Sequence, residues 1–205
     1  IRLRARGYKG PVAILWADHL IENEKLFLET LQKAEKISLE NPDKIIFVGK
    51  KPRFANNNLG WIHFGEKTSG GLFKYKKWFY KPPTDECQKM FESREWLWNT
   101  GYFFMDIDFG CYLYEKYQPE MYKKLLQIEK AVVKSNEKEV VKKVYPTMEK
   151  ISFDDAIAKN VQPNEALVME TNMEWADPGT LYALKEALIP KEKDNLVTGN
   201  VVTKD

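Results

Sequence analysis

Short apolar runs, each bounded by polar or turn-forming residues, divide the chain into alternating strands and helices. The segments 12–17 (VAILWA) and 45–48 (IIFV) are apolar throughout, which is typical of strands covered on both faces, as in a parallel sheet. Between them, Asn23 is placed to cap an amphipathic helix, and 41–43 (NPD) ends that helix. A strand, a helix and a second strand in this order predict a βαβ unit with a right-handed crossover.

The pattern changes after residue 50. The segments 59–66 and 72–80 flank a Gly-containing turn at 68–71 and predict a β-hairpin. The further predicted elements are a helix over 84–95, a strand at 102–105, a helix that begins at Pro119, a strand at 166–169 and a helix opened by Asp177 and Pro178. We interpret 134–143 as a helix end followed by an exposed loop. One mixed α/β domain over 1–194 accounts for these elements, and 195–205 is expected to begin a C-terminal strand or β-helix segment.

The balance of charges argues against nucleic acid as a partner. The chain has 32 Lys and Arg against 30 Asp and Glu, a net charge of +2, whereas a nucleic-acid-binding domain usually carries a basic stripe. We therefore interpret the lysine-rich stretches 74–81 and 138–143 as solvated faces. The longest apolar runs have the length of strands, so we also expect no membrane partner.

The cysteines indicate a reducing compartment. Cys87 and Cys111 have neither metal-ligand spacing nor the pattern of a disulfide framework, and unpaired thiols are typical of intracellular proteins. No signal peptide is visible, so we expect a cytoplasmic location. The sequence begins at Ile1 without an initiator Met, and we expect it to be a fragment.

Two acidic residues are candidates for a metal site. Asp18 directly follows the apolar run 12–17, and ligands of open α/β sheets collect at the carboxyl ends of strands. Asp177 precedes Pro178. Each has a structural alternative, because Asp18 suits a turn or a helix cap and Asp-Pro is a common helix start. As a pair, the two carboxylates suit Mg²⁺. We interpret the neighbouring His19 as a packing histidine.

Two polar segments have similar alternatives. The loop 56–61 (NNNLGW) consists of residues that tolerate left-handed backbone, or it is a lid in which Gly60 lets a ligand approach the backbone. Asn99 lies in an aromatic-rich stretch. A buried amide needs hydrogen-bond partners, so Asn99 is either a structural hub or a group that binds sugar hydroxyls.

Six segments in register resemble the motifs of mannose-1-phosphate guanylyltransferases. They are 16–21 (WADHLI, family PADHvI), 49–62 (GKKPRFANNNLGWI, family GIxPTxPxTGYGYI), 78–82 (WFYKP, family FvEKP), 98–103 (WNTGYF, family WNSGMF), 152–157 (SFDDAI, family SIDYAV) and 175–180 (WADPGT, family WSDVGSW). Their order and spacing run through nearly the whole chain. The resemblance implies a Rossmann-like GT-A nucleotide-diphospho-sugar transferase fold with a mixed sheet, incomplete at the N-terminus. It also implies the formation of GDP-mannose and pyrophosphate from GTP and mannose 1-phosphate.

The same resemblance implies roles for single residues. Asp18 and Asp177 match the metal-binding aspartates, and Mg²⁺ with cationic side chains would absorb charge during in-line attack on the α-phosphorus. Asp18 and Lys81 are the implied catalytic residues, and Lys81 matches the lysine near the sugar phosphate. The implied substrate-binding residues are Gly60, Lys81, Asn99 and Asp154.

The sequence also departs from the family pattern. The Gly-rich loop GGxGTRLWPLSR, which cradles the triphosphate, is not among these residues, so we expect the isolated chain to be inactive. Tyr80 replaces the Glu of EKP and removes an acceptor for sugar hydroxyls. Two functions stay open. One is part of a nucleotidylyltransferase that binds GTP and hexose 1-phosphate, as a homo-oligomer or with a complementing N-terminal segment. The other is a noncatalytic sugar-phosphate-binding or regulatory module of the same fold.

Overall fold

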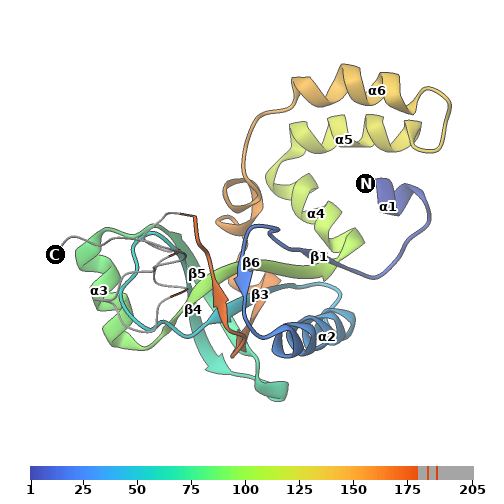
Figure 1. The fold of residues 1–205 in the computed structure, drawn as a ribbon. Coiled ribbons are helices and arrows are strands. Elements are labelled where there is room, and N and C mark those ends of the chain that lie inside the picture. Colours follow the sequence, from blue (N-terminus) through green and yellow to red (C-terminus); the bar gives the residue numbers. More distant parts are fainter. Residues whose placement is uncertain (180–183, 185–187, 189–205) are drawn as a thin grey trace, which may run out of the picture.

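The computed structural model describes residues 1–179 together with Leu184 and Leu188. A six-stranded mixed sheet with the order β1-β6-β3-β7-β5-β4 lies at its centre (Figure 1). Its strands are β1 (Pro11–Ile14), β3 (Ile45–Lys50), β4 (Gly60–Lys67), β5 (Phe73–Tyr80), β6 (Trp96–Asp106) and β7 (Ala166–Thr171). β3 and β7 run parallel, and the other neighbouring pairs run antiparallel. The predicted mixed α/β class is confirmed.

Helices cover the sheet and extend it at one end. They are α1 (Arg2–Ala5), α2 (Glu24–Glu40), α3 (Thr84–Ser93), α4 (Ile107–Tyr117), α5 (Pro119–Ala131) and α6 (Glu137–Val144). α2 packs against β1, β3 and β6, whereas α1, α4, α5 and α6 gather beyond the β1 side of the sheet (Figure 1). The predicted helix after Asp177 and the predicted segment 195–205 lie outside the described residues, apart from the isolated positions 184 and 188.

α2 forms where the sequence predicts it. The Asn23 side chain caps the helix by accepting a hydrogen bond from the Leu26 N–H at 3.1 Å, which satisfies one of the unpaired donors of the first turn. Its buried face contains Ala34 and Ile37, three residues apart as helical periodicity requires. The helix ends at Glu40, and its C-cap Asn41 is the first residue of the predicted stop.

The central strand β3 is apolar throughout because both of its faces are covered. Ile45 and Phe47 belong to the apolar cluster on one face of the sheet, and Ile46 and Val48 belong to the cluster on the other. All four are fully buried. This alternation is the period-2 pattern of a strand, and it confirms that 45–48 is an interior strand.

The prediction for the first apolar run is wrong in its pairing. β1 is an edge strand, and it runs antiparallel to β6, which lies between β1 and β3. The strand ends at Ile14, and Leu15 and Trp16 are 40% and 41% exposed. The run resembles a buried parallel strand in sequence, but a strand from much later in the chain occupies the place beside it.

The helical end of the molecule contains three elements that the sequence analysis missed, which are α1, α4 and α6. α4 begins directly after β6, where the Asp106 side chain accepts a hydrogen bond from the Asp108 N–H at 2.8 Å. α6 occupies most of 134–143, which we interpreted as a helix end and an exposed loop. None of the α6 residues is fully buried, but Val140, Val141 and Val144 are half-buried on one face of the helix, which packs against α5.

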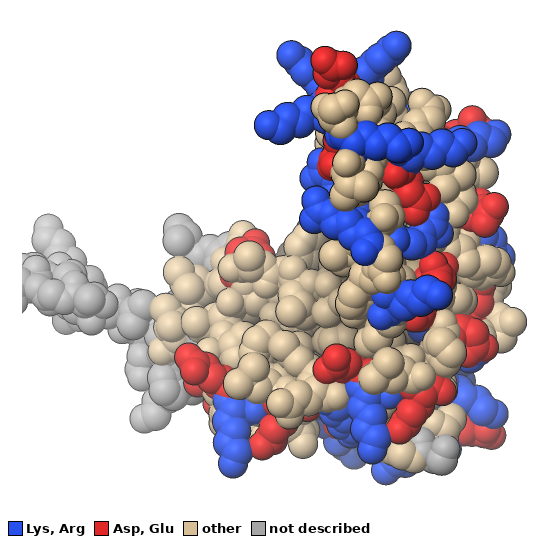
Figure 2. All heavy atoms as spheres, turned by 90° about the vertical axis from the view of Figure 1, so that its right-hand side faces the viewer, with Lys and Arg blue, Asp and Glu red and all other residues tan. Residues whose placement is uncertain are grey.

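Charges on this face are mixed in sign. Figure 2 shows Lys and Arg interspersed with Asp and Glu over the side that contains the helical end. In α6, Glu137 and Glu139 lie in the first turn and Lys142 and Lys143 in the last, the arrangement that favours the helix dipole. Within residues 1–179, no helix combines the length and apolarity needed to cross a bilayer.

Glu165 connects the helical end to β7. This carboxylate is 5% exposed and accepts hydrogen bonds from Lys116 Nζ at 2.7 Å, from the Tyr117 hydroxyl and from the Gln162 N–H at 3.0 Å. Burial alone would raise the pKa of Glu165, but these donors outweigh burial and hold the pKa below its ordinary value.

A depressed carboxyl pKa makes the stability of the fold depend on pH. The contribution of ionised Glu165 is complete above its unfolded pKa of about 4.3 and disappears as the pH falls through the lower folded value. Glu165→Gln should lower the free energy of unfolding at pH 7 by about 1–3 kcal/mol, and this difference from wild type should shrink at pH 3. Urea unfolding at both pH values measures it. Glu66→Gln, which removes an exposed Lys74 pair in the β4–β5 hairpin, is the control and should leave stability nearly unchanged. A difference in the free energy of unfolding of equal size at both pH values would contradict a lowered pKa of Glu165 in the folded protein.

Candidate active site

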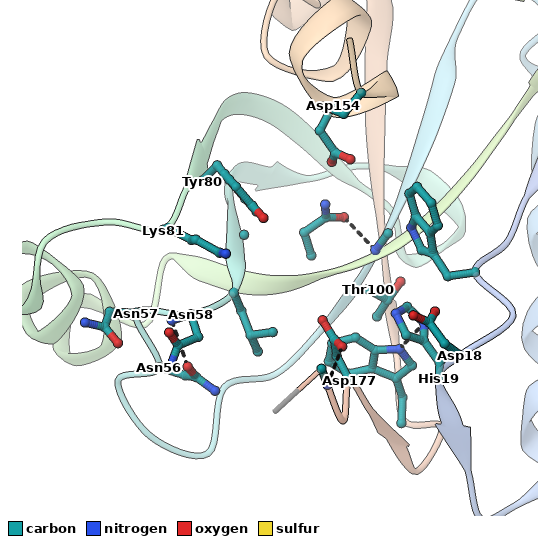
Figure 3. Close-up of a pocket in the computed structure, with 18 of the residues that line it drawn as sticks. Asp18, His19, Asn56, Asn57, Asn58, Tyr80, Lys81, Thr100, Asp154 and Asp177 are labelled. Atoms are coloured by element: carbon teal, nitrogen blue, oxygen red, sulfur yellow. Dashed lines mark hydrogen bonds between the residues drawn. The ribbon is translucent and has the colours of Figure 1, made fainter. Parts of the chain in front are cut away.

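An open cavity of about 1020 Å³ brings the predicted residues together. The six positions implied by separate sequence motifs all line it, and they are Asp18, Gly60, Lys81, Asn99, Asp154 and Asp177. In Figure 3, Asp18, His19 and Asp177 lie at one end of the cavity, Tyr80 and Lys81 lie at the other, and Asp154 points in from above.

The cavity opens where β6 changes its neighbour. One edge of β6 pairs with β3. On its other edge, residues 96–98 pair with β4 and residues 103–106 pair with β1. The stretch 99–102 between them has no neighbour on that edge in the described sheet, and Gly101 has a φ of +73°. Irregularities of this kind often direct strand residues towards a site, and Asn99, Thr100 and Gly101 line the cavity.

Asn99 has the structural role that was one of the two alternatives left open by its sequence. Its Oδ1 accepts a hydrogen bond from the Gly101 N–H at 3.1 Å, so the side chain supports the bend in β6. Its Nδ2 has no hydrogen bond to another described residue and is available as a donor. Gly60 is packed against it, because a Cβ at position 60 would lie 3.3 Å from the Asn99 Cβ. The absence of a side chain at Gly60 therefore keeps this part of the cavity wall compact.

A short second ladder brings the two metal-candidate carboxylates together. β2 (Leu20–Ile21) and β8 (Trp175–Ala176) form an antiparallel pair in which Leu20 faces Ala176. Residues that precede β2 therefore lie beside residues that follow β8, which explains why Asp18 and Asp177 share one end of the cavity (Figure 3). Our prediction that Asp18 directly follows a strand of a parallel sheet is wrong, because β1 ends at Ile14 and runs antiparallel to β6.

Asp18 and Asp177 suit a cation that takes only part of its coordination shell from the protein and the rest from water or phosphate oxygens. The Asp177 Oδ1 accepts a hydrogen bond from the Gly179 N–H at 3.2 Å, and neither aspartate has an ion-pair partner among the described residues. Residues 1–179 contain no group of three or more His, Cys, Asp or Glu that could hold a metal ion. Mg²⁺ is commonly bound by one or two carboxylates, with water and phosphate oxygens completing the octahedron, and this donor set suits it.

His19 lies between the carboxylates and two aromatic residues. Its Nδ1 is 2.9 Å from Trp175 Nε1 and 3.2 Å from the Tyr102 hydroxyl. Burial lowers the pKa of His19, although the charges of Asp177 and Asp18 act in the opposite direction. These contacts agree with a packing histidine, but His19 also lines the cavity. Sequence reasoning missed Trp175 and Tyr102 as supports of the site.

Lys50 holds the β8 side of the site in place. Its Nζ donates a hydrogen bond to the Trp175 carbonyl oxygen at 3.2 Å. Burial, followed by the charge of Arg53, lowers the pKa of Lys50. Arg53 itself lines the cavity. Neither residue was a sequence candidate, although both lie in the segment 49–62 that resembles a family motif.

Lys81 and Tyr80 form the opposite end of the cavity. Lys81 has a φ of +48°, and its N–H donates to the Leu59 carbonyl oxygen at 3.2 Å. Its Nζ lies 5.0 Å from the centre of the Tyr80 ring. That ring is 53% exposed, and it stacks on Trp78 at 5.6 Å with an interplanar angle of 3°. Position 80 thus presents an aromatic face where the family motif has a carboxylate.

Asp154 supplies a partly buried carboxylate to the cavity from above its two ends, as Figure 3 is drawn. It begins the π-helical segment Asp154–Ala158, and burial raises the pKa of Asp154, with a smaller contribution from the charge of Asp155. Asp155 has different partners, since it accepts hydrogen bonds from Ser152 at 3.0 Å and from Lys159 at 2.9 Å. Asp154 is therefore the member of the pair that is free to accept a ligand hydroxyl.

A substitution at Gly101 tests whether Trp16 packs against this residue in the cavity wall. A Cβ at this position would lie 2.2 Å from Trp16 Nε1, so Gly101→Ala should displace the indole in addition to straining a positive φ. Gly7→Ala is the matched control, because Gly7 has a φ of +83° with no atom within 4 Å of the added Cβ. The control should lose about 1–2 kcal/mol of stability, and Gly101→Ala should lose more and change the tryptophan fluorescence. Equal losses with unchanged fluorescence would show that Trp16 does not pack on Gly101.

Comparison with known proteins identifies proteins that are similar to this chain over more than nine-tenths of its length. No family model matches the sequence. A mannose-1-phosphate guanylyltransferase of Salmonella montevideo is 28% identical over 198 residues, which cover 93% of this chain and 41% of that protein. One from Salmonella typhimurium is 27% identical over 194 residues, covering 92% of this chain and 39% of that protein.

The fold agrees with these relatives. A crystal structure described as the mannose-1-phosphate geranyltransferase of Thermus thermophilus superimposes with a TM-score of 0.82 at 21% identity, over 97% of this chain and 55% of that one. The predicted fold is confirmed. The chain spans about 41% of the length of the Salmonella montevideo relative. Over nearly all of its own length, it is homologous to part of the mannose-1-phosphate guanylyltransferases, as its six motif segments predict.

Proposed function

We propose that the protein containing this chain is a nucleotidylyltransferase that forms GDP-mannose and pyrophosphate from GTP and mannose 1-phosphate. The observation that carries the proposal is that six residues, each implied by a different motif segment, line one cavity. The activities named for the relatives support the same reaction. Because the chain covers 41% of the first of these relatives, the proposal concerns the whole protein, and the isolated 205 residues are expected to be inactive.

The sugar is proposed to occupy the part of the cavity between Asn99, Asp154 and Tyr80. The free Nδ2 of Asn99 donates to a sugar hydroxyl, and the Asp154 carboxylate accepts from one. The exposed face of Tyr80 packs against the apolar face of the pyranose ring. This arrangement replaces one hydroxyl acceptor of the family motif with an aromatic surface, and it still leaves a donor and an acceptor to orient the sugar.

The phosphate chemistry is proposed to take place between Lys81 and the two aspartates. Asp18 and Asp177 hold Mg²⁺, which when bound neutralises charge on phosphate oxygens. Lys81 neutralises the sugar phosphate from the opposite end of the cavity. An oxygen of the sugar phosphate attacks the α-phosphorus in line, and the bond to the leaving pyrophosphate breaks. A phosphate monoester loses its second proton near pH 6, so the attacking oxygen is already ionised at pH 7 and needs no general base.

Neutralising the carboxylate pair tests this reaction. In the natural full-length polypeptide, Asp18→Asn and Asp177→Asn should each lower kcat at least about 100-fold, the loss typical of removing a charge-stabilising group. Pyrophosphate release from GTP and mannose 1-phosphate with Mg²⁺ measures it. Asp43→Asn, which neutralises an aspartate paired with Lys44 outside the cavity lining, should retain the wild-type rate. Wild-type rates in both site variants would remove the pair from the mechanism.

The same assay separates the enzyme from the noncatalytic alternative. A wild-type protein that binds mannose 1-phosphate, but releases no pyrophosphate with any nucleoside triphosphate, would be a sugar-phosphate-binding or regulatory module. Calorimetry with mannose 1-phosphate supplies the binding measurement. Loss of both binding and turnover would contradict both functions.

Replacing Lys81 should raise the stability of the fold and weaken ligand binding. Left-handed backbone is unfavourable for lysine and tolerated by asparagine. Lys81→Asn should therefore raise the free energy of unfolding by up to about 1 kcal/mol while weakening mannose 1-phosphate binding about tenfold or more. Arg94→Asn is the control, because Arg94 has a φ of +58° at the C-cap of α3. It should gain similar stability with unchanged binding. Unchanged binding by Lys81→Asn would exclude Lys81 from phosphate recognition.

A further inference from the structure

Trp175 determines which nitrogen of His19 carries the proton. The Trp175 Nε1 lies 2.9 Å from the His19 Nδ1. An indole N–H is a donor only, so Nδ1 must be the acceptor and cannot hold a proton. A neutral imidazole has one N–H, and in His19 this proton must therefore lie on Nε2.

Tyr102 supports the same arrangement. Its hydroxyl lies 3.2 Å from the same Nδ1, and burial raises the pKa of Tyr102 to about 12, so the hydroxyl remains protonated. The His19 ring meets the Trp175 ring edge-on, at 5.3 Å and 90°, and it lies 5.4 Å from the Tyr102 ring. These contacts hold the imidazole on two sides and leave it little freedom to rotate.

The second ring nitrogen of His19 has no hydrogen-bond partner in the part of the chain that the structure describes. Among residues 1–179, no hydrogen bond involves the His19 Nε2. In imidazole the two nitrogens point in nearly opposite directions, so Nε2 points away from Trp175. His19 lines the cavity with Asp18 and Asp177, and all three lie at the same end of it in Figure 3.

We propose that His19 contributes an Nε2–H donor to the cavity, where it binds an anionic phosphoryl oxygen of the ligand. The inference rests on the proposed function for the identity of that ligand. Asp18, His19 and Asp177 line the same cavity, but no group of three such residues in the described part of the chain could hold a metal ion, and a protonated Nε2 has no lone pair to offer a metal. His19 is thus a phosphate-binding residue, and Trp175 is the positioning residue that fixes its tautomer.

Nuclear magnetic resonance tests the tautomer directly. The whole sequence contains two histidines, so long-range ¹H–¹⁵N spectra of the 205-residue chain contain two imidazole spin systems, and His63→Gln assigns them. His19 should show a single tautomer with a protonated Nε2 and an unprotonated Nδ1. Trp175→Phe removes the donor and should give a mixture of tautomers. A proton on Nδ1 of wild-type His19 would overturn the proposal.

The second measurement tests the ligand, with magnesium chloride alone and with magnesium pyrophosphate as probes. Magnesium alone should leave the Nε2–H of His19 in place, whereas magnesium pyrophosphate should shift its resonance. His19→Gln places an amide donor near the position of Nε2 and should bind pyrophosphate within about twofold of wild type. His19→Asn, whose amide reaches only as far as Nδ1, should bind about tenfold more weakly.

Two results would overturn the role of His19. One is a His19 resonance that magnesium pyrophosphate does not move, and the other is equal affinity of the asparagine and wild-type chains. Both measurements are made without turnover. Absence of GDP-mannose synthesis would therefore count against the proposed function and leave the tautomer result intact, whereas a proton on Nδ1 would leave the proposed function intact.

Discussion

The change of neighbour along β6 is the constraint on which the rest of the structure depends. A buried strand needs a hydrogen-bonding partner on each edge, and β6 obtains these from β3 on one side and from β4 and then β1 on the other. β4 and β1 both run antiparallel to β6, and between them residues 99–102 of β6 have no partner on this edge of the described sheet. In this unpaired stretch the Asn99 side chain accepts a hydrogen bond from the Gly101 N–H, Gly101 has a positive φ, and both residues line the cavity. The cavity is therefore a consequence of how the sheet is completed.

The two ends of the cavity depend on different supports. Lys81 is positioned by the main sheet, since it directly follows β5 and its N–H is bonded to the loop residue Leu59. Asp18 and Asp177 depend on a ladder of only two residue pairs. Two pairs are too few to be stable alone. The ladder is joined to the main sheet by the His19 contact with Tyr102 of β6, by the hydrogen bond from Lys50 of β3 to the Trp175 carbonyl oxygen, and by the burial of Trp175 in an apolar cluster. The carboxylate end is thus the part of the site that relies most on side-chain contacts.

Sequence alone predicted those parts of the fold that local pattern determines. The Asn23 cap and the apolar strand β3 are confirmed, since a cap and a fully covered strand each leave a signature within a few residues. The pairing of β1 with β6 was not predictable, because it joins residues 89 to 95 positions apart and an apolar run does not reveal its neighbour. For the site, family resemblance supplied the positions that line the cavity. The His19–Trp175 contact was not predicted, because each residue by itself is explained by ordinary packing.

Backbone strain in the described residues separates structural from functional positions. Three non-glycine residues have positive φ, and they are Lys81, Arg94 and Val133. Arg94 is the C-cap of α3 and Val133 immediately follows the C-cap of α5, and left-handed residues are usual at helix ends. Lys81 ends a strand, where no such explanation applies, and its side chain lines the cavity. Strain without a structural cause is expected where function requires a particular side-chain direction, and this argument for Lys81 does not depend on the family motif that first identified it.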